Sequence, residues 1–396
     1  MKKVSASGKY WALFLATLGL VVNFWAWSLL SPLGTQLAKE LVISPTQLSL
    51  LLAMPVIIGA LGRIALGILT DKLGGRYTFA LVCFLTALPV IGLCMTHSYV
   101  SLLLVATLLG IGGASFVVGI PFLSDWFPVE KRGLMIGIYS MGNAGTALSG
   151  FLTPRLDELL GRQQTFLLVA ALLIILAIVF LLFGRNAPGW KPPKTSSLTR
   201  IKKAVTFPLT RDISMVYIVT FGAFVAFGVY LPVLLRIAYG LSLTDAATRA
   251  AGFILIATLA RPIGGWLGDK IGGRLVIQLS LIAIVILACF TAFQSTLAIE
   301  TTIAYLTLAF TLGCANGASF ALVGKLTKPE IMGSVTGVIG AAGGLGGFLP
   351  PIILGITHQQ THSYTPALFM LAVSALIVLV YISIRFRDRK VYHMFR

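Results

Sequence analysis

The chain has 396 residues, 57% of them hydrophobic and 11% charged. Together with a mean hydropathy of +0.95, this composition excludes a soluble globular domain and indicates a protein that crosses the lipid bilayer many times. The net charge of +18 would suit nucleic-acid binding, but the basic residues lie in alternate loops between apolar segments, so no nucleic-acid partner is expected.

Apolar runs recur along the whole chain, and each reaches the roughly 20 residues that a helix needs to cross a hydrocarbon core of about 30 Å. The pattern predicts an all-α integral membrane fold with twelve transmembrane helices. In chain order the predicted spans are about 9–31, 46–70, 77–96, 99–125, 133–155, 164–184, 213–236, 246–268, 275–295, 300–325, 332–356 and 364–386.

Basic residues concentrate in the loops on one side of these spans, and in the central segment and the C-terminal tail. By the positive-inside rule, both termini and the central loop are predicted to be cytoplasmic, in a multi-pass protein of the inner (plasma) membrane. The start MKK is followed by a full-length apolar run without a small-residue cleavage pattern, so we interpret this run as the first helix.

The four cysteines fall inside predicted helices without paired spacing. Cys83, Cys94, Cys289 and Cys314 therefore predict neither a disulfide framework nor a metal site, and no cofactor is expected.

The sequence repeats itself on either side of a segment rich in Pro, Ser and basic residues. GRIALGILTDKLGGR at 62–76 matches ARPIGGWLGDKIGGR at 260–274, with one offset of 198 residues for the arginine, aspartate and final arginine. GGASF at 112–116 recurs as NGASF at 316–320. The chain is thus predicted to have an N-terminal six-helix bundle (1–184), a cytoplasmic linker (185–212) and a C-terminal six-helix bundle (213–396).

Arg63 and its repeat counterpart Arg261 are predicted to lie at membrane depth. On a helix, Arg63 is about 24 Å from Gln47 at the outer end and about 12 Å from Asp71 at the cytoplasmic end. A guanidinium at this depth costs about 2.5–3.5 kcal/mol on insertion scales, so two matched copies need a partner.

The partner is not found among the acidic residues, because all twelve Asp and Glu residues fall in loops or at helix ends. Arginine keeps its proton, so the interpretation is that a small anion binds between the two guanidinium groups, one from each half. The structural alternative is that each arginine snorkels to the interface or bonds to backbone carbonyls.

The D-K-x-G-G-R loops resemble the signature of the major facilitator superfamily, whose fold has two pseudo-symmetric six-helix halves. The charged residues of these loops are expected to form a conformational latch at the cytoplasmic face. They are Asp71, Lys72, Arg76, Asp269, Lys270 and Arg274.

A more specific resemblance is carried by GIGGASFVVGIPFLSDWFPVEKRGLMIGIYSMGNAGTALSGFLTP at 110–154 and GCANGASFALVGKLTKPEIMGSVTGVIGAAGGLGGFLPP at 313–351. Both resemble the glycine-rich signatures of the nitrate/nitrite porter family. The resemblance implies transport of nitrate and nitrite, with a substrate site made of Arg63, Arg261, Asn143, Tyr217, Phe116 and Phe221. In that site guanidiniums pair with the anion oxygens, Asn and Tyr donate hydrogen bonds, and Phe rings pack on the faces of the anion.

These residues also have ordinary interpretations. Phe116, Tyr217 and Phe221 could be core packing residues, and Asn143 could bond a neighbouring helix. The signature glycines are expected to permit close helix approach and sliding, and so to serve motion before binding. They are Gly137, Gly142, Gly145, Gly337, Gly340, Gly343 and Gly344.

No intramembrane Asp, Glu or His is predicted that could carry a coupling proton. We therefore expect nitrate/nitrite antiport in which the two halves rock about the site, because two facing cations oppose closure of the empty carrier. Nitrate/proton symport and nitrite export remain alternatives on the same fold. An integral-membrane enzyme lacks a metal-type cluster or an activated nucleophile, a channel would not need two rocking halves, and a receptor would normally append a soluble domain. The protein is expected to be a monomer.

Overall fold

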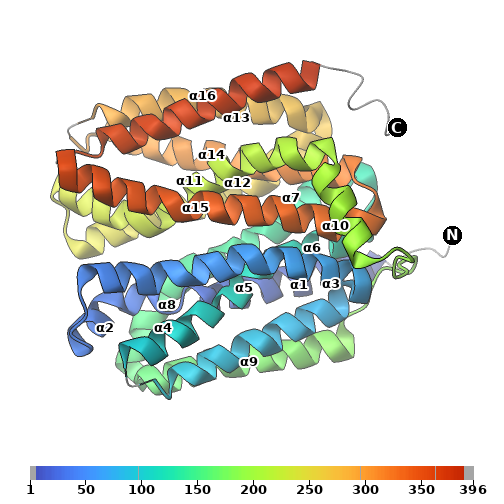
Figure 1. Ribbon diagram of the computed structural model, residues 1–396, viewed down its shortest axis with the longest axis horizontal. Helices are drawn as coiled ribbons and strands as arrows, with labels where there is room; N and C mark the ends of the chain where they lie inside the picture. The colour runs from blue at the N-terminus through green and yellow to red at the C-terminus, as the bar shows by residue number, and fades with distance from the viewer. Residues whose placement is uncertain (1–5, 97, 295, 362, 388–396) are drawn as a thin grey trace. The chain divides into compact units, whose positions relative to one another are not determined.

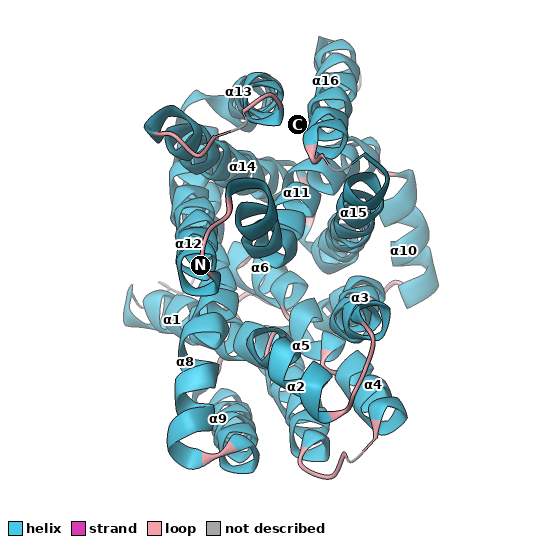
Figure 2. Ribbon diagram, turned by 90° about the vertical axis from the view of Figure 1, so that its left-hand side faces the viewer, coloured by secondary structure: helices cyan, strands magenta, loops and turns pink. Residues whose placement is uncertain are grey.

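The computed structural model describes residues 6–96, 98–294, 296–361 and 363–387. Within these ranges the regular structure is entirely helical, as Figure 2 shows by the absence of strands. The predicted all-α class is thus confirmed, and the individual helices can be followed by colour in Figure 1.

Contacts divide the chain into two compact units. Unit 1 comprises Met1–Pro128, Tyr139–Ala204 and Lys328–Ala341, and unit 2 comprises Val129–Ile138, Val205–Thr327 and Ala342–Arg396. Residues 129–138, at the beginning of the predicted fifth helix, belong to unit 2, and residues 328–341, at the beginning of the predicted eleventh helix, belong to unit 1. Residues 185–204 of the linker belong to unit 1.

Unit 1 holds the helices of the predicted first half. The second part of α3 lies alongside α9 in Figure 1. The elements are α1 (Ala6–Trp27), η1 (Ser31–Leu33), α2 (Gly34–Glu40), α3 (Pro45–Leu93), α4 (Tyr99–Leu108), α5 (Gly110–Ala114), α6 (Phe116–Ser124), η3 (Met141–Ala144), α8 (Gly145–Leu160), α9 (Arg162–Phe183), most of α10 (Ser197–Thr206) and η5 (Pro329–Ile331).

Unit 2 has the corresponding arrangement in the second half. Figure 1 shows α13 beside α16, and α12 packs along α14. The elements are η2 (Val129–Lys131), α11 (Pro208–Tyr239), α12 (Leu243–Leu267), the π-helical η4 (Gly268–Gly272), α13 (Gly273–Ala292), α14 (Ile299–Leu326) and α16 (Thr365–Arg387). Like α10, two further helices have parts in both units, α7 (Arg132–Ser140) and α15 (Met332–Thr361).

The chain reverses at the first glycine of each G-G-R sequence. α3 begins with a capping box between Ser44 and Gln47, and it contains a kink at Gly74, where φ is +77°. Gly272, its repeat counterpart, has φ +97°. A side chain is strained in this left-handed region, so the repeated glycines allow two antiparallel membrane crossings to follow each other with almost no loop.

Nine segments of the described chain are long and apolar enough to cross a membrane. Two of them, Leu50–Leu93 and Thr248–Ala292, have 44 and 45 residues, which is enough for two crossings each. The remaining predicted span, 133–155, is divided among α7, η3 and α8. This pattern is consistent with twelve spans. The linker also contains α10, a helix that its Pro- and Ser-rich composition does not predict.

Candidate functional site

Arg63 on α3 and Arg261 on α12 are each 1% exposed, and they are among the largest fully buried side chains of the described residues. Arg63 belongs to unit 1 and Arg261 to unit 2. Other helices pack closely around each arginine, because glycines of those helices lie against the arginine backbone. The two arginines nevertheless differ in what their guanidinium groups contact.

The Arg63 guanidinium donates to backbone carbonyl oxygens. Its Nη1 lies 2.6 Å from the oxygen of Gly340, and Nε and Nη2 lie 3.4 and 3.3 Å from that of Gly113. Carbonyl bonding is what the structural alternative expects of a membrane arginine. These hydrogen bonds hold the Arg63 side chain in place within unit 1.

The Arg261 guanidinium lies against aromatic rings. Its central carbon is 4.7 Å from the ring centre of Phe224 and 5.6 Å from that of Phe221. Its Nε and Nη2 atoms are buried and have no hydrogen-bond partner in the part of the chain that the structure describes. The ion pairs found among the described residues use other arginines. Unpaired buried N–H donors are costly, so this guanidinium is equipped to bind an acceptor.

One face of α11 brings further predicted residues to Arg261. Tyr217 and Phe221 are one turn apart, and their rings stack at 4.7 Å with an interplanar angle of 8°. Phe320 of α14 meets Tyr217 edge-on at 5.0 Å. Tyr217 is fully buried and Phe221 is 1% exposed. Unit 2 therefore assembles Arg261, Tyr217 and Phe221 into one connected cluster.

Unit 1 connects its predicted residues less directly. Phe116 follows Gly113, the carbonyl partner of Arg63, by one turn, and its ring stacks with that of Tyr139 at 5.9 Å. The Tyr139 hydroxyl donates to the Phe116 carbonyl oxygen at 2.8 Å. Asn143 is one turn beyond Tyr139, in η3, and is fully buried.

The Asn143 amide bonds to its own helix rather than to a neighbouring one. Nδ2 donates to the Ser140 carbonyl oxygen at 2.6 Å, while Oδ1 is buried without a hydrogen-bond partner among the described residues. Nδ2 carries two N–H groups, and the bond to Ser140 uses one of them. The second N–H of Asn143 can therefore donate to another acceptor without breaking this bond.

The signature glycines lie where helices pack at backbone distance. A Cβ on Gly337 would stand 2.7 Å from the Arg63 carbonyl oxygen, and one on Gly137 would stand 2.8 Å from the Arg261 carbonyl oxygen. Gly340 is likewise confined, because its Cβ would come within 3.0 Å of the Arg63 Cδ atom. Each arginine helix is therefore crossed by a glycine-bearing helix in the same repeated way.

The other predicted glycines have different neighbours. A Cβ on Gly142 would meet Leu20, and one on Gly145 would overlap the Val21 carbonyl oxygen, which shows that these glycines hold η3 and α8 against α1. A Cβ on Gly343 would overlap the Tyr217 ring. Gly344 lies buried within α15.

The two loop aspartates bind the first turns of helices. Asp71 Oδ1 accepts from the Gly333 amide at 2.7 Å, and Oδ2 accepts from the amide and hydroxyl of Ser334 at 3.0 and 2.7 Å. Asp269 accepts from the amides of Gly133 and Leu134 at 3.1 and 2.9 Å. Free N–H groups and the positive end of the helix dipole both favour a carboxylate at these positions.

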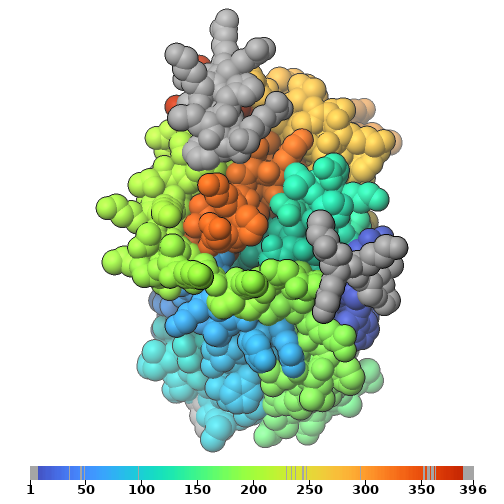
Figure 3. Space-filling view, turned by 90° about the vertical axis from the view of Figure 1, so that its right-hand side faces the viewer, coloured from blue at the N-terminus to red at the C-terminus, as the bar shows by residue number. Residues whose placement is uncertain are grey.

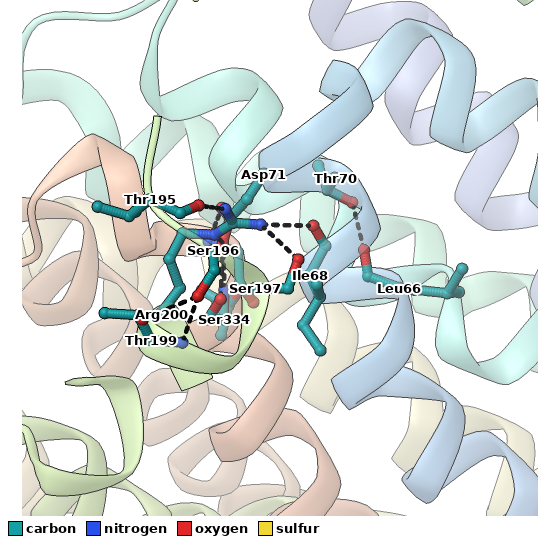
Figure 4. Close-up of polar contacts among 12 residues, drawn as sticks. Leu66, Ile68, Thr70, Asp71, Thr195, Ser196, Ser197, Thr199, Arg200 and Ser334 are labelled. Carbon is teal, nitrogen blue, oxygen red and sulfur yellow. Dashed lines mark hydrogen bonds and ion pairs between the residues drawn. The ribbon is translucent and has the colours of Figure 1, made fainter. Parts of the chain in front are cut away.

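Arg200 joins this network from α10, which sequence reasoning did not foresee (Figure 4). Its Nε lies 3.7 Å from Asp71 Oδ2, Nη1 donates to Thr195 O at 2.6 Å, and Nη2 lies 3.3 Å from Ser197 Oγ. The residue is only 2% exposed. In the sequence Arg200 is one of many basic linker residues, and no local signal marks it.

The linker covers the part of unit 1 that contains this network. Figure 3 shows its green residues lying above the blue residues of α3. Asn186 contributes a second attachment, because its Oδ1 accepts from the Arg76 amide at 3.1 Å. The linker is thus fixed to α3 at two places within unit 1.

Of the remaining predicted latch residues, the two arginines bind helix ends. Arg76 donates to the Leu181 carbonyl oxygen near the end of α9, and Arg274 donates to the Phe386 carbonyl oxygen near the end of α16. Cations at helix C-termini are favourable. Lys72 and Lys270 are both exposed, and the Lys270 Nζ lies 4.5 Å from the Trp266 ring centre. Within the described ranges, no cluster of His, Cys, Asp and Glu could hold a metal ion.

Comparison with known proteins agrees with this architecture. The family model of the Major Facilitator Superfamily matches residues 16–351. The crystal structure of the human organic anion transporter MFSD10 (TETRAN) has a TM-score of 0.77 at 14% identity, covering 94% of this chain and 99% of that chain. The fold is therefore that of a multi-pass membrane transporter rather than an enzyme.

Two relatives are similar over nearly their whole length. The probable nitrate/nitrite transporter NarK2 of Mycobacterium tuberculosis is 42% identical over 380 residues, which cover 95% of this chain and 96% of the relative. The nitrite extrusion protein of Bacillus subtilis is 37% identical over 364 residues, covering 92% and 91%. The chain belongs to the nitrate/nitrite porter family of the major facilitator superfamily.

Proposed function

We propose that this protein is a secondary active transporter that exchanges nitrate for nitrite across the plasma membrane. The observation that carries the proposal is the buried Arg261 guanidinium, whose Nε and Nη2 donors have no partner among the described residues. The names of the relatives give the anion class, and Arg63 is its repeat counterpart.

In this proposal Arg63 and Arg261 bind the same anion. Guanidinium groups suit a planar oxyanion because their N–H donors form a fork that matches two oxygens. The Tyr217 hydroxyl and the Asn143 amide donate further hydrogen bonds, and the rings of Phe116 and Phe221 provide flat apolar surfaces.

Exchange rather than one-way flow is expected from the two fixed charges. An arginine cannot lose its proton, so an empty carrier keeps both positive charges in a poorly solvated site, and their repulsion opposes the conformational change. A bound nitrate or nitrite removes this barrier. The carrier then returns only when an anion is available on the other side.

The crossing glycines and the loop aspartates supply the conformational machinery in this account. Glycine contacts let helices slide with little side-chain interlocking. The bonds of Asp71 to α15 and of Asp269 to α7 hold one state, and their release permits the other. The distribution of basic loops supports cytoplasmic termini, and the working unit is proposed to be a monomer.

Counterflow in proteoliposomes tests the exchange. Liposomes loaded with nitrite and diluted into labelled nitrate should take up label several-fold faster than empty liposomes, whether or not a pH gradient is imposed. Nitrate/proton symport predicts the opposite pattern, in which an inward proton gradient drives uptake into empty liposomes. That second result would exclude obligatory exchange while leaving the anion site intact.

A further inference from the structure

Asn316 on α14 is buried beside the Arg261 cluster, and its side-chain amide makes fewer hydrogen bonds than it could. It is 1% exposed, and its Nδ2 atom has no hydrogen-bond partner among the residues that the structure describes. Its Oδ1 lies 2.8 Å from the hydroxyl of Thr220 on α11. An unpaired amide of this kind is costly in a membrane protein, which suggests a partner for it.

The Thr220 hydroxyl cannot pair with both N–H groups of the Asn316 side-chain amide, whichever way that amide is turned. The Thr220 Oγ1 atom also lies 2.9 Å from the Val216 carbonyl oxygen, and a hydroxyl has one proton to donate. If the proton goes to Val216, the Asn316 amide can turn and donate one N–H to Oγ1. An amide has two N–H groups, so at least one is left over in both arrangements.

Asn316 belongs to the same cluster as the predicted anion ligands. Thr220 shares the α11 face of Tyr217 and Phe221, and Phe320 lies one turn after Asn316 and contacts the Tyr217 ring. Gly317, the next residue, is so close to α12 that a Cβ would overlap the Arg261 carbonyl oxygen. The residues that carry two of the unpaired N–H groups of unit 2, Arg261 and Asn316, are therefore both at the crossing of α12 and α14.

We propose that Asn316 is a specificity-determining residue that donates a hydrogen bond to an oxygen of nitrate bound at Arg261. The inference rests on the proposed function. A guanidinium fork pairs with two oxygens of a planar anion, which accounts for both oxygens of nitrite. Nitrate has a third oxygen. A neutral N–H donor next to the fork therefore favours nitrate over nitrite without adding charge.

Isosteric removal of the amide tests this role. Asn316→Leu keeps the approximate shape and removes both donors, and it should weaken nitrate binding about tenfold while weakening nitrite binding less than about threefold, as loss of one hydrogen bond to a charged ligand predicts. Asn316→Ser keeps a hydroxyl donor and should give an intermediate nitrate affinity. Dissociation constants of both anions are measured by calorimetry on the purified full chain.

Asn23→Leu is the matched control. Asn23 is also fully buried, but its Nδ2 already donates to Gly19 O and Cys83 Sγ in unit 1, so its replacement should leave the ratio of the two affinities unchanged. Equal losses for nitrate and nitrite in the Asn316 variants, or no loss, would overturn the inference alone. A wild-type protein that binds neither anion would overturn the proposed function with it.

Discussion

At the scale of single residues, the feature that bears most on function is that some buried hydrogen-bond donors have no partner in the described structure. Arg63 is anchored to carbonyl oxygens, whereas Arg261 and Asn316 keep unpaired N–H groups in the described structure. Buried polar groups normally find partners, and we propose that these two exceptions in unit 2 bind the anion. Tyr217 adds a hydroxyl to the same cluster.

Tyr217→Phe should weaken nitrate binding about three- to tenfold. The substitution removes one hydrogen-bond donor and keeps the ring that stacks on Phe221. Calorimetric titration with nitrate measures the effect. Tyr305→Phe is the control, because Tyr305 is also a buried tyrosine of unit 2 but packs against Phe227. Similar losses in the two variants would show that the hydroxyl of Tyr217 has no special part in binding.

Sequence reasoning can find the arginines but not every residue around them. An arginine in an apolar helix is conspicuous, and its repetition at one offset makes it more so. Asn316 occupies the repeat position that Gly112 has in the first half, so a polar residue replaces a glycine there. This difference is visible in the sequence, but only the structure shows which residue of α11 contacts Asn316. Arg200 gave no signal, because its role depends on a contact with Asp71 from a distant segment.

At the scale of helices, the two repeats use the same crossing. Gly67 of α3 meets Gly333 of α15, and Gly265 of α12 meets Gly133 of α7, at positions where a Cβ would overlap a backbone oxygen. One turn further on, Asp71 and Asp269 cap the first turns of α15 and α7. Close packing and the cap therefore form one structural element, which occurs once in each unit.

Gly265→Ala should reduce transport at least about tenfold, because the added methyl group collides with the Gly133 carbonyl oxygen and forces the helices apart. Initial rates of nitrate counterflow measure the loss. Gly252→Ala, on the same helix α12, is a matched control because a Cβ there meets nothing within 4 Å. If both variants transport at the wild-type rate, the close crossing is not needed for function.

Arg200→Gln should loosen the linker from α3. The substitution removes the charge that faces Asp71 and the Nη1 bond to Thr195, so trypsin should cleave the linker at neighbouring lysines several-fold faster. Arg185→Gln also removes one tryptic site from the linker, but Arg185 is exposed, so cleavage elsewhere should keep its rate. An unchanged rate in Arg200→Gln would mean that other contacts hold α10.

The pair of Glu40 and Arg162 predicts a pH dependence of stability. The hydrogen bond from Arg162 lowers the pKa of Glu40 below its ordinary value of 4.5. Stability from this pair is present above that value and is lost as the pH falls through the lowered pKa. The melting temperature of wild type should therefore exceed that of Glu40→Gln near neutral pH, and the difference should shrink in acid. A difference that grows in acid would contradict this sign.

At the scale of the whole molecule, the repeated sequence determines the architecture. The two matched G-G-R reversals and the apolar segments predict an all-helical transporter, and the described structure has these features. By contacts, Val129–Ile138 belongs to unit 2 and Lys328–Ala341 belongs to unit 1. Hydropathy reports where helices lie along the chain, and it does not report which helices they pack against.

In the proposed function, the two buried arginines Arg63 and Arg261 bind one anion. Arginine to lysine substitution tests this directly, because an ammonium replaces the planar fork with a point charge. Arg249→Lys is the control, since Arg249 is an exposed arginine of the same helix as Arg261 and pairs with Asp245.

The decisive measurement is a calorimetric nitrate titration of wild type, Arg63→Lys, Arg261→Lys and Arg249→Lys. We predict one nitrate per chain in wild type and in Arg249→Lys, and affinity reduced at least about tenfold in each of the other two variants. Wild-type affinity in either Arg63→Lys or Arg261→Lys would contradict the shared anion site.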